Sequence, residues 1–471
     1  MKGKLFLLLM SFQPKEWKAF EVFLEGRNFK HREDVQAIYR VAKEICMSSQ
    51  PVEPAKTAFM EHSFPGRRME LNDFRYLEAE LVQKIEEWWV WRELKQDRVR
   101  YRTILLKAMQ KRSLQKPFRT TLDKAFQDLE ALPHRDMEYL LLRYQLHNHA
   151  FEFASRQENR GMDPGLSDML HDLKDLYQTG SLKYGSLMVN LGNVVQSPVE
   201  PETVQGLLSL GAESNDGFSP GAELYYHILL TLTDPSQETH YFKLLQLLDE
   251  KAKFFSQEEV GQLYAFALNY CIKKLNEGRS DYLERLFELY QQLLEKKAIF
   301  IGPYIQQQHF KNIVTTSVRL EQFPWTETFL RQYSAKVSPS ARENATTYNW
   351  AYLHFARREY SAALRLLQEV EFTDVYYHVD SKALLLKTYY ELEEWEPLLS
   401  LTEAFSNYLR RNKMLSDYQR KVYWNFVKFS KKLVRKRLGS RKPVAEIISE
   451  MERVREVADL RWLKLKAIEL Q

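Results

Sequence analysis

The sequence predicts an all-α protein, built as an α-α solenoid of helical hairpins. Apolar residues recur at helical spacing through most of the 471 residues, and strand-type alternation of apolar and polar residues is absent. The chain has only 16 glycines and 16 prolines, too few to punctuate many short strands. Trp325, Tyr360 and Trp395 lie 35 residues apart, each just after a short polar break. A fixed period of this length is typical of stacked helical pairs.

Residues 1–120 are expected to form an N-terminal helical domain. Apolar spacing predicts helices near 14–24 and 34–48 and one long helix over 71–109. The apolar run at 5–10 is shorter than the roughly 7–15 residues of a secretory signal, and no cleavage site follows it. We therefore expect this run to be an amphipathic first helix that packs on Trp17 and Phe20.

Residues 121–305 are expected to form a region of irregular helical hairpins, with helices at 165–178 and 181–196 among others. The segment 197–219 is rich in proline and glycine and is predicted to be a linker with at most one short helix. Its end, Gly217 to Gly221, matches the G-x-S-x-G pattern of hydrolases. No strand precedes Ser219, however, and Pro220 has no N–H for an oxyanion hole. Ser219 is instead predicted to cap a helix that begins at Pro220.

The third region, 306–471, carries the repeat. In "NATTYNWAYLHFARREYSAALRLLQEV" (344–370), Ala351 and Ala363 lie twelve residues apart and Tyr360 opens the second helix. This unit resembles a tetratricopeptide repeat, in which small residues at such positions let two helices approach closely. Weaker copies extend the resemblance over about 309–407. The opening residues "SFQPKEWKAFEVFLEGRNF" (11–29) resemble the N-terminal helices of uncharacterised bacterial helical-repeat proteins. Two long helices, 416–438 and 443–469, are expected to cap the array.

The resemblance implies a concave groove lined by the first helix of each pair. A peptide or protein partner would bind there, because aromatic side chains supply contact area at low entropic cost. The alternative is that the stack closes on itself and these rings are core. The predicted groove residues are Phe310, Ile313, Tyr348, Tyr352, Phe355, Lys387 and Tyr390.

The net charge of +5 conceals two strongly basic segments. Residues 92–119 hold 10 Lys/Arg against 2 Asp/Glu, and residues 410–442 hold 13 against 1. The second segment places a positive stripe on one side of the helix at 416–438. Such a stripe can follow a phosphate backbone, dock on acidic parts of the same chain or remain solvated. Its members are Arg420, Lys421, Lys428, Lys431, Lys432, Arg435 and Lys436.

No established catalytic, nucleotide-binding or zinc-protease motif is present that fits its structural context. His147 and His149 lie two residues apart on a helix and point away from each other, so they do not form a metal site. Cys46 and Cys271 have no metal-site spacing and are expected to be free thiols in a reducing compartment.

We therefore expect a non-catalytic cytoplasmic scaffold for protein or peptide partners, without a cofactor, a metal or a membrane span. The alternative is a nucleic-acid-associated helical-repeat protein that uses segments 92–119 and 410–442.

Overall fold

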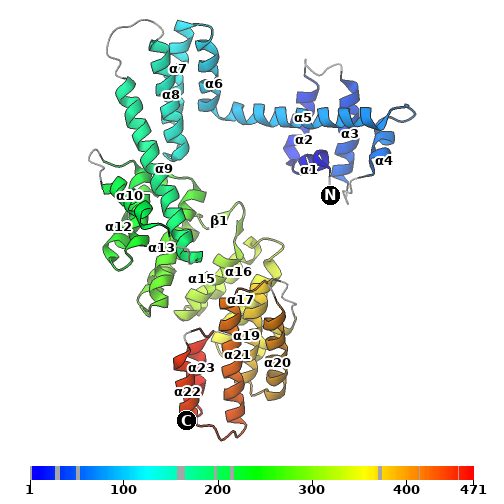
Figure 1. Ribbon diagram of the computed structural model, residues 1–471. Helices are drawn as coiled ribbons and strands as arrows, with labels where there is room; N and C mark the ends of the chain where they lie inside the picture. The colour runs from blue at the N-terminus through cyan, green and yellow to red at the C-terminus, as the bar shows by residue number, and fades with distance from the viewer. Residues whose placement is uncertain are drawn as a thin grey trace. The chain divides into compact units, whose positions relative to one another are not determined.

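The predicted all-α class is confirmed. The computed structural model describes residues 3–26, 32–48, 54–155, 165–195, 199–212, 217–369, 374–412, 414–454 and 456–471. Within these ranges the chain forms 23 α-helices, two short 3₁₀ helices (Ala252–Phe254 and Ser334–Lys336) and one small hairpin, and it is 80% helical (Figure 1). Helices that follow one another in sequence pack as adjacent pairs, which is the arrangement of a helical array.

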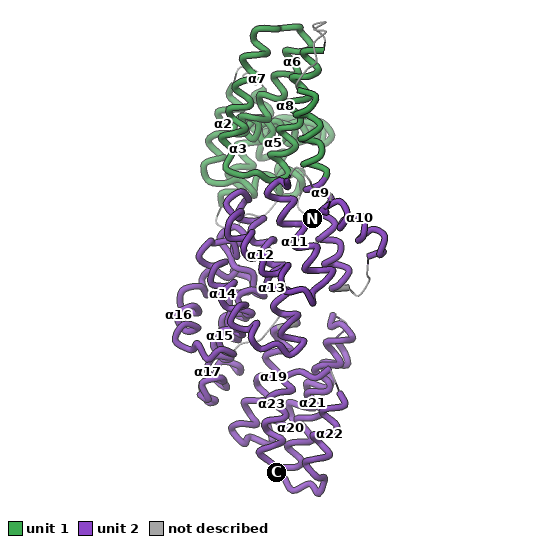
Figure 2. Tube along the Cα trace, turned by 90° about the vertical axis from the view of Figure 1, so that its left-hand side faces the viewer, with its two compact units in different colours: residues 1–177 green, residues 178–471 purple. Residues whose placement is uncertain are grey.

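Two compact units make up the chain (Figure 2): unit 1, Met1–Tyr177, and unit 2, Gln178–Gln471. The boundary between them falls inside helix α9. The division into 1–120, 121–305 and 306–471 stays a prediction. Unit 1 contains α1 Lys4–Met10, α2 Pro14–Leu24, α3 Glu33–Met47, α4 Lys56–Ser63, α5 Leu71–Gln96, α6 Arg98–Gln110, α7 Gln115–Glu130, α8 Met137–Ser155 and the beginning of α9 Gly165–Val195.

Unit 2 holds the remaining helices and the hairpin. Its first half contains α10 Pro201–Ala212, α11 Pro220–Thr233, α12 Glu238–Lys251, α13 Gln257–Asn276, α14 Tyr282–Glu295, β1 Phe300–Ile301 and β2 Tyr304–Ile305. Its second half contains α15 Gln307–Arg319, α16 Phe323–Tyr333, α17 Arg342–Ala356, α18 Tyr360–Glu369, α19 Val375–Glu391, α20 Trp395–Arg411, α21 Asp417–Arg437, α22 Val444–Arg453 and α23 Leu460–Ile468.

The first apolar run packs as expected. Leu5, Phe6 and Leu9 of α1 are buried in one cluster with Trp17 and Phe20 of α2. A second core in unit 1 lies among α6, α7 and α8, where the rings of Phe118 and Phe153 stack with centroids 3.8 Å apart. Each cluster removes a continuous apolar helix face from water, which is the main source of stability in such helices.

Several predicted boundaries are wrong, each for a local reason. The long helix 71–109 breaks at Asp97, whose carboxylate accepts a hydrogen bond from the backbone N–H of Arg100 at 2.9 Å and caps α6. The helices 165–178 and 181–196 are one helix, α9, because Gly180 continues the helical backbone. The last predicted helix is two, α22 and α23, separated by a break that ends at the left-handed residue Asp459. The β1–β2 hairpin was not predicted.

The predicted linker contains one short helix, α10, as expected, and its residues 197–198 and 213–216 lie outside the described ranges. Ser219 caps α11, because its hydroxyl accepts a hydrogen bond from the backbone N–H of Ala222 at 3.2 Å. The 35-residue period also marks helix starts, with Trp325, Tyr360 and Trp395 in the first turns of α16, α18 and α20. Ala351 and Ala363 are fully buried on the paired helices α17 and α18.

Six of the helix-ending turns in the described part of the chain share one hydrogen-bond pattern. After α17, the N–H of Arg358 bonds to the carbonyl of Phe355 at 3.0 Å and the N–H of Glu359 to that of His354 at 2.9 Å. This pair of bonds is the Schellman motif, which requires a left-handed residue just beyond the helix. The same pair of bonds and a positive φ recur after α6, α13, α15, α19 and α21, at Ser113, Gly278, Glu321, Glu393 and Gly439.

No helix within the described part of the chain is long and apolar enough to cross a membrane.

Arg358→Gly is expected to stabilise unit 2. The exposed Arg358 has φ 63°, a left-handed conformation that costs an L-residue about 1–2 kcal/mol and costs glycine little. Part of that gain is offset by the greater freedom of glycine in the unfolded chain, which leaves a net gain of up to about 1 kcal/mol. Thermal unfolding followed by circular dichroism measures it. The matched control, Arg365→Gly in the middle of α18, should lower stability by about 1 kcal/mol, and equal effects at both positions would refute the interpretation of the turn.

Candidate functional site

The face of unit 2 where first helices of hairpins meet carries the candidate site. Helices α15, α17, α19 and α21 contact one another in that order. A cavity of about 410 Å³, which we call the Lys311 pocket, opens among three of them. Its lining is mostly polar and comes from α15, from α19 with the residue before it, and from α21: Gln307, Gln308, Lys311, Asn312, Asp374, Tyr377, Val379, Asp380, Gln419 and Tyr423.

A charged network crosses the wall of this pocket. The carboxylate of Asp380 on α19 accepts hydrogen bonds from the ammonium of Lys311 on α15 and from the hydroxyl of Tyr423 on α21. The Lys311 ammonium also lies 5.5 Å from the ring centroid of Tyr348 and 5.8 Å from that of Tyr377, within the range of cation–π attraction. Burial, followed by the nearby negative charge of Asp380, raises the pKa of Tyr423 well above its ordinary value. Its phenol is therefore a neutral hydrogen-bond donor.

A second ion pair closes the next part of the face. The ammonium of Lys387 on α19 lies 2.8 Å from the carboxylate of Asp459, just before α23, and 5.2 Å from the centroid of the Phe355 ring. Lys466 on α23 also bonds to Glu391 at 2.8 Å. These contacts attach the C-terminal helices to the end of α19, so the face is more enclosed here than around the Lys311 pocket.

Most of the seven predicted groove residues are buried in the structure. Phe310 and Ile313 are fully buried, and Tyr348, Lys387 and Tyr390 are buried too, at 7%, 5% and 7% exposure. Tyr352 and Phe355 are half-buried. The burial of Phe310, Ile313, Tyr348 and Tyr390 is what the alternative interpretation, a stack that closes on itself, expects. The apolar side of each first helix packs inward because that is where its buried area is greatest.

The residues that line the Lys311 pocket were missed by the sequence analysis. Gln308 and Lys311 lie on α15 beside the predicted Phe310, but about 100° or more around the helix, so they face the pocket while Phe310 faces the core. Asp380 meets Lys311 across 69 residues of sequence and Tyr423 across 43. Helical spacing within one segment carries no signal for a pair of that kind.

The basic stripe on α21 is largely paired with acidic residues of its own chain. Lys421 lies 2.5 Å from Glu456, and Arg420 lies 2.7 Å from Asp417. Lys431 pairs with Glu403, and Lys432 with Glu450. The remaining three have other neighbours: Lys428 lies 5.7 Å from the Phe429 ring, Lys436 donates to the Ser440 carbonyl at 3.3 Å, and the charge of Arg435 helps to lower the pKa of Glu403.

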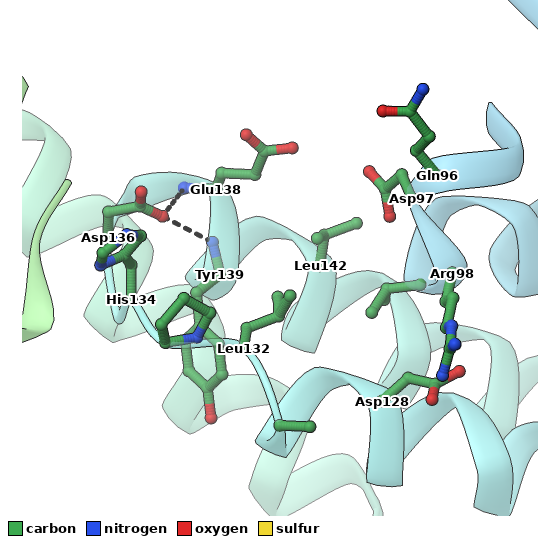
Figure 3. Close-up of a pocket in the computed structure, with 13 residues that line it drawn as sticks. Gln96, Asp97, Arg98, Asp128, Leu132, His134, Asp136, Glu138, Tyr139 and Leu142 are labelled. Atoms are coloured by element: carbon green, nitrogen blue, oxygen red, sulfur yellow. Dashed lines mark hydrogen bonds between the residues drawn. The ribbon is translucent and has the colours of Figure 1, made fainter. Parts of the chain in front are cut away.

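The other basic segment, 92–119, is partly paired in the same way. Arg92 pairs with Glu16, Arg100 with Glu138, and Arg102 with Asp128 at 2.5 Å. A cavity of about 410 Å³ lies beside it where α6, α7 and α8 meet (Figure 3). Its carboxylates have structural partners, since Asp136 accepts the backbone N–H groups of Glu138 and Tyr139 at 3.0 and 3.1 Å. Asp136 thus caps the first turn of α8.

The other residues singled out in the sequence have structural partners or are buried. His147 contacts the carboxylate of Asp172, and burial lowers the pKa of His149. Cys271 is a buried free thiol, and burial raises its pKa to about 11. Cys46 is half-buried. Over the described ranges, no group of three or more His, Cys, Asp or Glu side chains is placed to hold a metal ion.

Comparison with protein-family models, with curated proteins and with solved structures finds no match to this chain.

Glu450→Gln is expected to remove an acid-sensitive part of the stability of unit 2. Hydrogen bonds from Lys432 and then Lys442 lower the pKa of Glu450 from 4.5 to about 2. Because the pKa is lower in the folded state, this contribution is complete above about pH 4.5 and is lost as the pH falls toward 2. Surface pairs of this kind contribute about 0–1 kcal/mol each.

Urea unfolding at a series of pH values measures the effect. The wild-type protein should lose more stability than Glu450→Gln between pH 5 and pH 3. Glu452→Gln, which changes a more exposed carboxylate of the same helix, should follow the wild-type curve. Parallel curves for the wild type and Glu450→Gln would contradict the pairing.

Proposed function

We propose that the protein is a non-catalytic scaffold that binds an extended segment of a partner protein in the Lys311 pocket. In this proposal α15–α20 act as tetratricopeptide-like repeats, with their first helices forming the binding face. The observation that carries it is the lining of the pocket, in which α15 and α21 present amide side chains, and α19 presents a carboxylate and a phenol, around one cavity of about 410 Å³.

Amide side chains suit a peptide backbone. Gln308, Asn312 and Gln419 each carry a carbonyl acceptor and an NH₂ donor, and peptide bonds present the complementary groups along an extended chain. Gln308 and Asn312 are exposed, so they are accessible to a ligand. The cavity also lies within the roughly 300–1,000 Å³ typical of ligand sites.

The Lys311–Asp380 pair supports the same interpretation. The lysine side chain is 27% exposed and the aspartate 15%, so the pair is already held in place before a partner arrives. A preorganised charge pair orients a ligand without the entropic cost of ordering long side chains on binding. It also discriminates against segments that would place an unpaired charge beside it.

Gln308→Trp is expected to block the pocket and abolish partner binding. Gln308 is exposed at the lining of the pocket, so a larger side chain obstructs the opening without disturbing the core. Proteins that co-purify from the native host after nuclease treatment should be lost from the variant, and the Kd of the purified partner should rise at least about tenfold, which is 1.4 kcal/mol.

The matched control is Gln127→Trp on the exposed side of α7, which should keep the partner. Both variants should unfold at the wild-type temperature. Retention of the same partner at unchanged affinity by Gln308→Trp would rule out this pocket as the binding site.

Nucleic-acid binding is the second candidate, and one observation in unit 1 favours it. Trp91 and Tyr101 are 52% and 53% exposed and line a pocket of about 410 Å³ with the exposed residues Lys95 and Arg98. The Lys95 ammonium lies 4.7 Å from a Trp91 ring centroid. Exposed aromatic rings with adjacent cations are what single strands require, since bases stack on the rings and phosphates pair with the cations.

Lys95→Gln/Arg98→Gln is expected to reduce the salt dependence of any single-strand binding. Each phosphate contact contributes about 0.7 to the log–log salt slope, so two lost contacts should lower the slope by about 1.4. Fluorescence anisotropy with a labelled oligothymidine at several salt concentrations measures it. Lys421→Gln/Lys428→Gln on the stripe is the control and should leave the slope unchanged. The absence of binding by the wild-type protein would eliminate this candidate.

A further inference from the structure

Helix α9, the long green helix in Figure 1, carries a row of large apolar side chains on its exposed side. Its buried side carries polar residues, among them Asp172, Asp175, Thr179 and Ser186, together with the core residues Leu182 and Val189. The exposures of the large apolar residues on the exposed side are Leu166 40%, Leu170 64%, Leu173 47%, Tyr177 63%, Tyr184 63%, Leu187 39%, Met188 43% and Leu191 60%. Soluble proteins rarely leave a contiguous row of such side chains in water unless something binds there.

Polar contacts fix which side of α9 faces inward. Asp172 and Asp175 lie 2.6 and 2.7 Å from the guanidinium of Arg143 on α8. The Ser186 hydroxyl donates to the carbonyl of Tyr225 on α11 at 3.1 Å. A rotation that buried the leucines would break these contacts and leave buried charges unpaired, which is strongly unfavourable. The apolar row therefore stays on the outer side of the helix.

The spacing of the row indicates what covers it. From Leu166 to Leu191, the leucines and tyrosines of this row and the half-buried Gly180 follow one another at intervals of 4, 3, 4, 3, 4, 3 and 4 residues. This is a heptad pattern with a mean period of 3.5, which keeps one seam facing a second helix wound around the first. It extends over about 38 Å at 1.5 Å per residue, and more than three heptads suffice for a coiled-coil seam. A second helix with the same period matches this seam.

The row is nearly symmetric about Gly180, because the same residue types follow in the same order toward either end of the helix. Tyr177 and Tyr184 flank it at distances of 3 and 4 residues. Leu173 and Leu187 both lie 7 residues from it, and Leu170 and Leu191 lie 10 and 11 residues away. A surface with this symmetry is complementary to itself under a two-fold rotation, which is the requirement for an isologous dimer interface.

We propose that two copies of this chain associate through α9, antiparallel, with Gly180 at the two-fold axis. Tyr177 then packs against Tyr184 of the partner subunit, and Leu173 against Leu187 of the partner subunit. Glycine at the axis lets the two helices approach closely at the centre, while the leucines fill the seam on each side. Few charges flank the seam, so antiparallel pairing brings no row of like charges together.

Sedimentation or light scattering of the full chain tests the association. The wild-type protein should have twice the 56.1 kDa mass of one chain at micromolar concentration. Leu173→Glu/Leu187→Glu should be monomeric with an unchanged circular dichroism spectrum, because both side chains already lie at the surface. The matched control is Leu438→Glu/Leu465→Glu, which changes two leucines that are 56% and 53% exposed, one just after α21 and one on α23, and it should remain dimeric. A monomeric wild type, or a dimer that survives the α9 double substitution, overturns the proposal.

Disulfide formation in a Cys46→Ser background tests the orientation. Gly180→Cys should cross-link under mild oxidation, since the two copies of that position face each other. Leu173→Cys alone should not cross-link, because its two copies would be about 21 Å apart along the helices. The double variant Leu173→Cys/Leu187→Cys should cross-link, because each Cys then faces the other position on the partner subunit. Efficient cross-linking by Leu173→Cys alone would show a parallel pair and overturn the two-fold axis at Gly180.

Discussion

A residue in the left-handed conformation at the end of a helix is the constraint on which the array in unit 2 depends. It ends α13, α15, α17, α19 and α21 with the same two hydrogen bonds and reverses the chain within a few residues. For α15, α17 and α19, the following helix then packs back on the one before it. Because the turn is the same each time, α15, α17, α19 and α21 contact one another in order, and the Lys311 pocket forms where they meet.

Polar contacts between helices give this array a defined register. Asp380 joins α15, α19 and α21 through Lys311 and Tyr423, and Lys387 joins α19 to the turn before α23. Partly buried ion pairs add little net stability, because desolvation offsets much of their attraction. These ion pairs instead favour one alignment of the helices over others, since a shift of one helix by a turn would leave a half-buried charge without its partner. The apolar clusters stabilise the helices, and the charge pairs determine which arrangement of them is adopted.

The sequence predicted the features that depend on neighbours in the chain. Helical periodicity identified the class, Ser219 was recognised as a cap, and the aromatic residues from Trp325 to Trp395 marked helix starts. It failed where competing local signals are nearly balanced, as at Asp97, which ends one helix and caps the next, and at Gly180, which continues a helix. Four of the six left-handed turn residues are Ser, Glu or Arg, so the positions of glycine in the sequence did not reveal these turns.

The candidate site was less predictable for a different reason. Helical spacing places Phe310 and Ile313 on the apolar side of α15, but it does not determine whether that side lines a groove or a core. The side chains that line the pocket depend on neighbours 43 and 69 residues away. The acidic partners of the basic stripe, such as Glu403 and Glu450, likewise come from other helices. Charge composition revealed the excess of lysine and arginine in this segment, but it did not reveal the acidic residues that pair with them.

The packing of each helix mainly on its neighbours in sequence also determines how the chain folds. Native contacts of short sequence separation require only small loops to close, so little chain entropy is lost before a hairpin gains its own buried area. Any of several hairpins can nucleate, and structure can then spread to the next hairpin in either direction. Amide hydrogens at the ends of such an array exchange sooner than those in its middle, because a terminal hairpin opens without disturbing the rest.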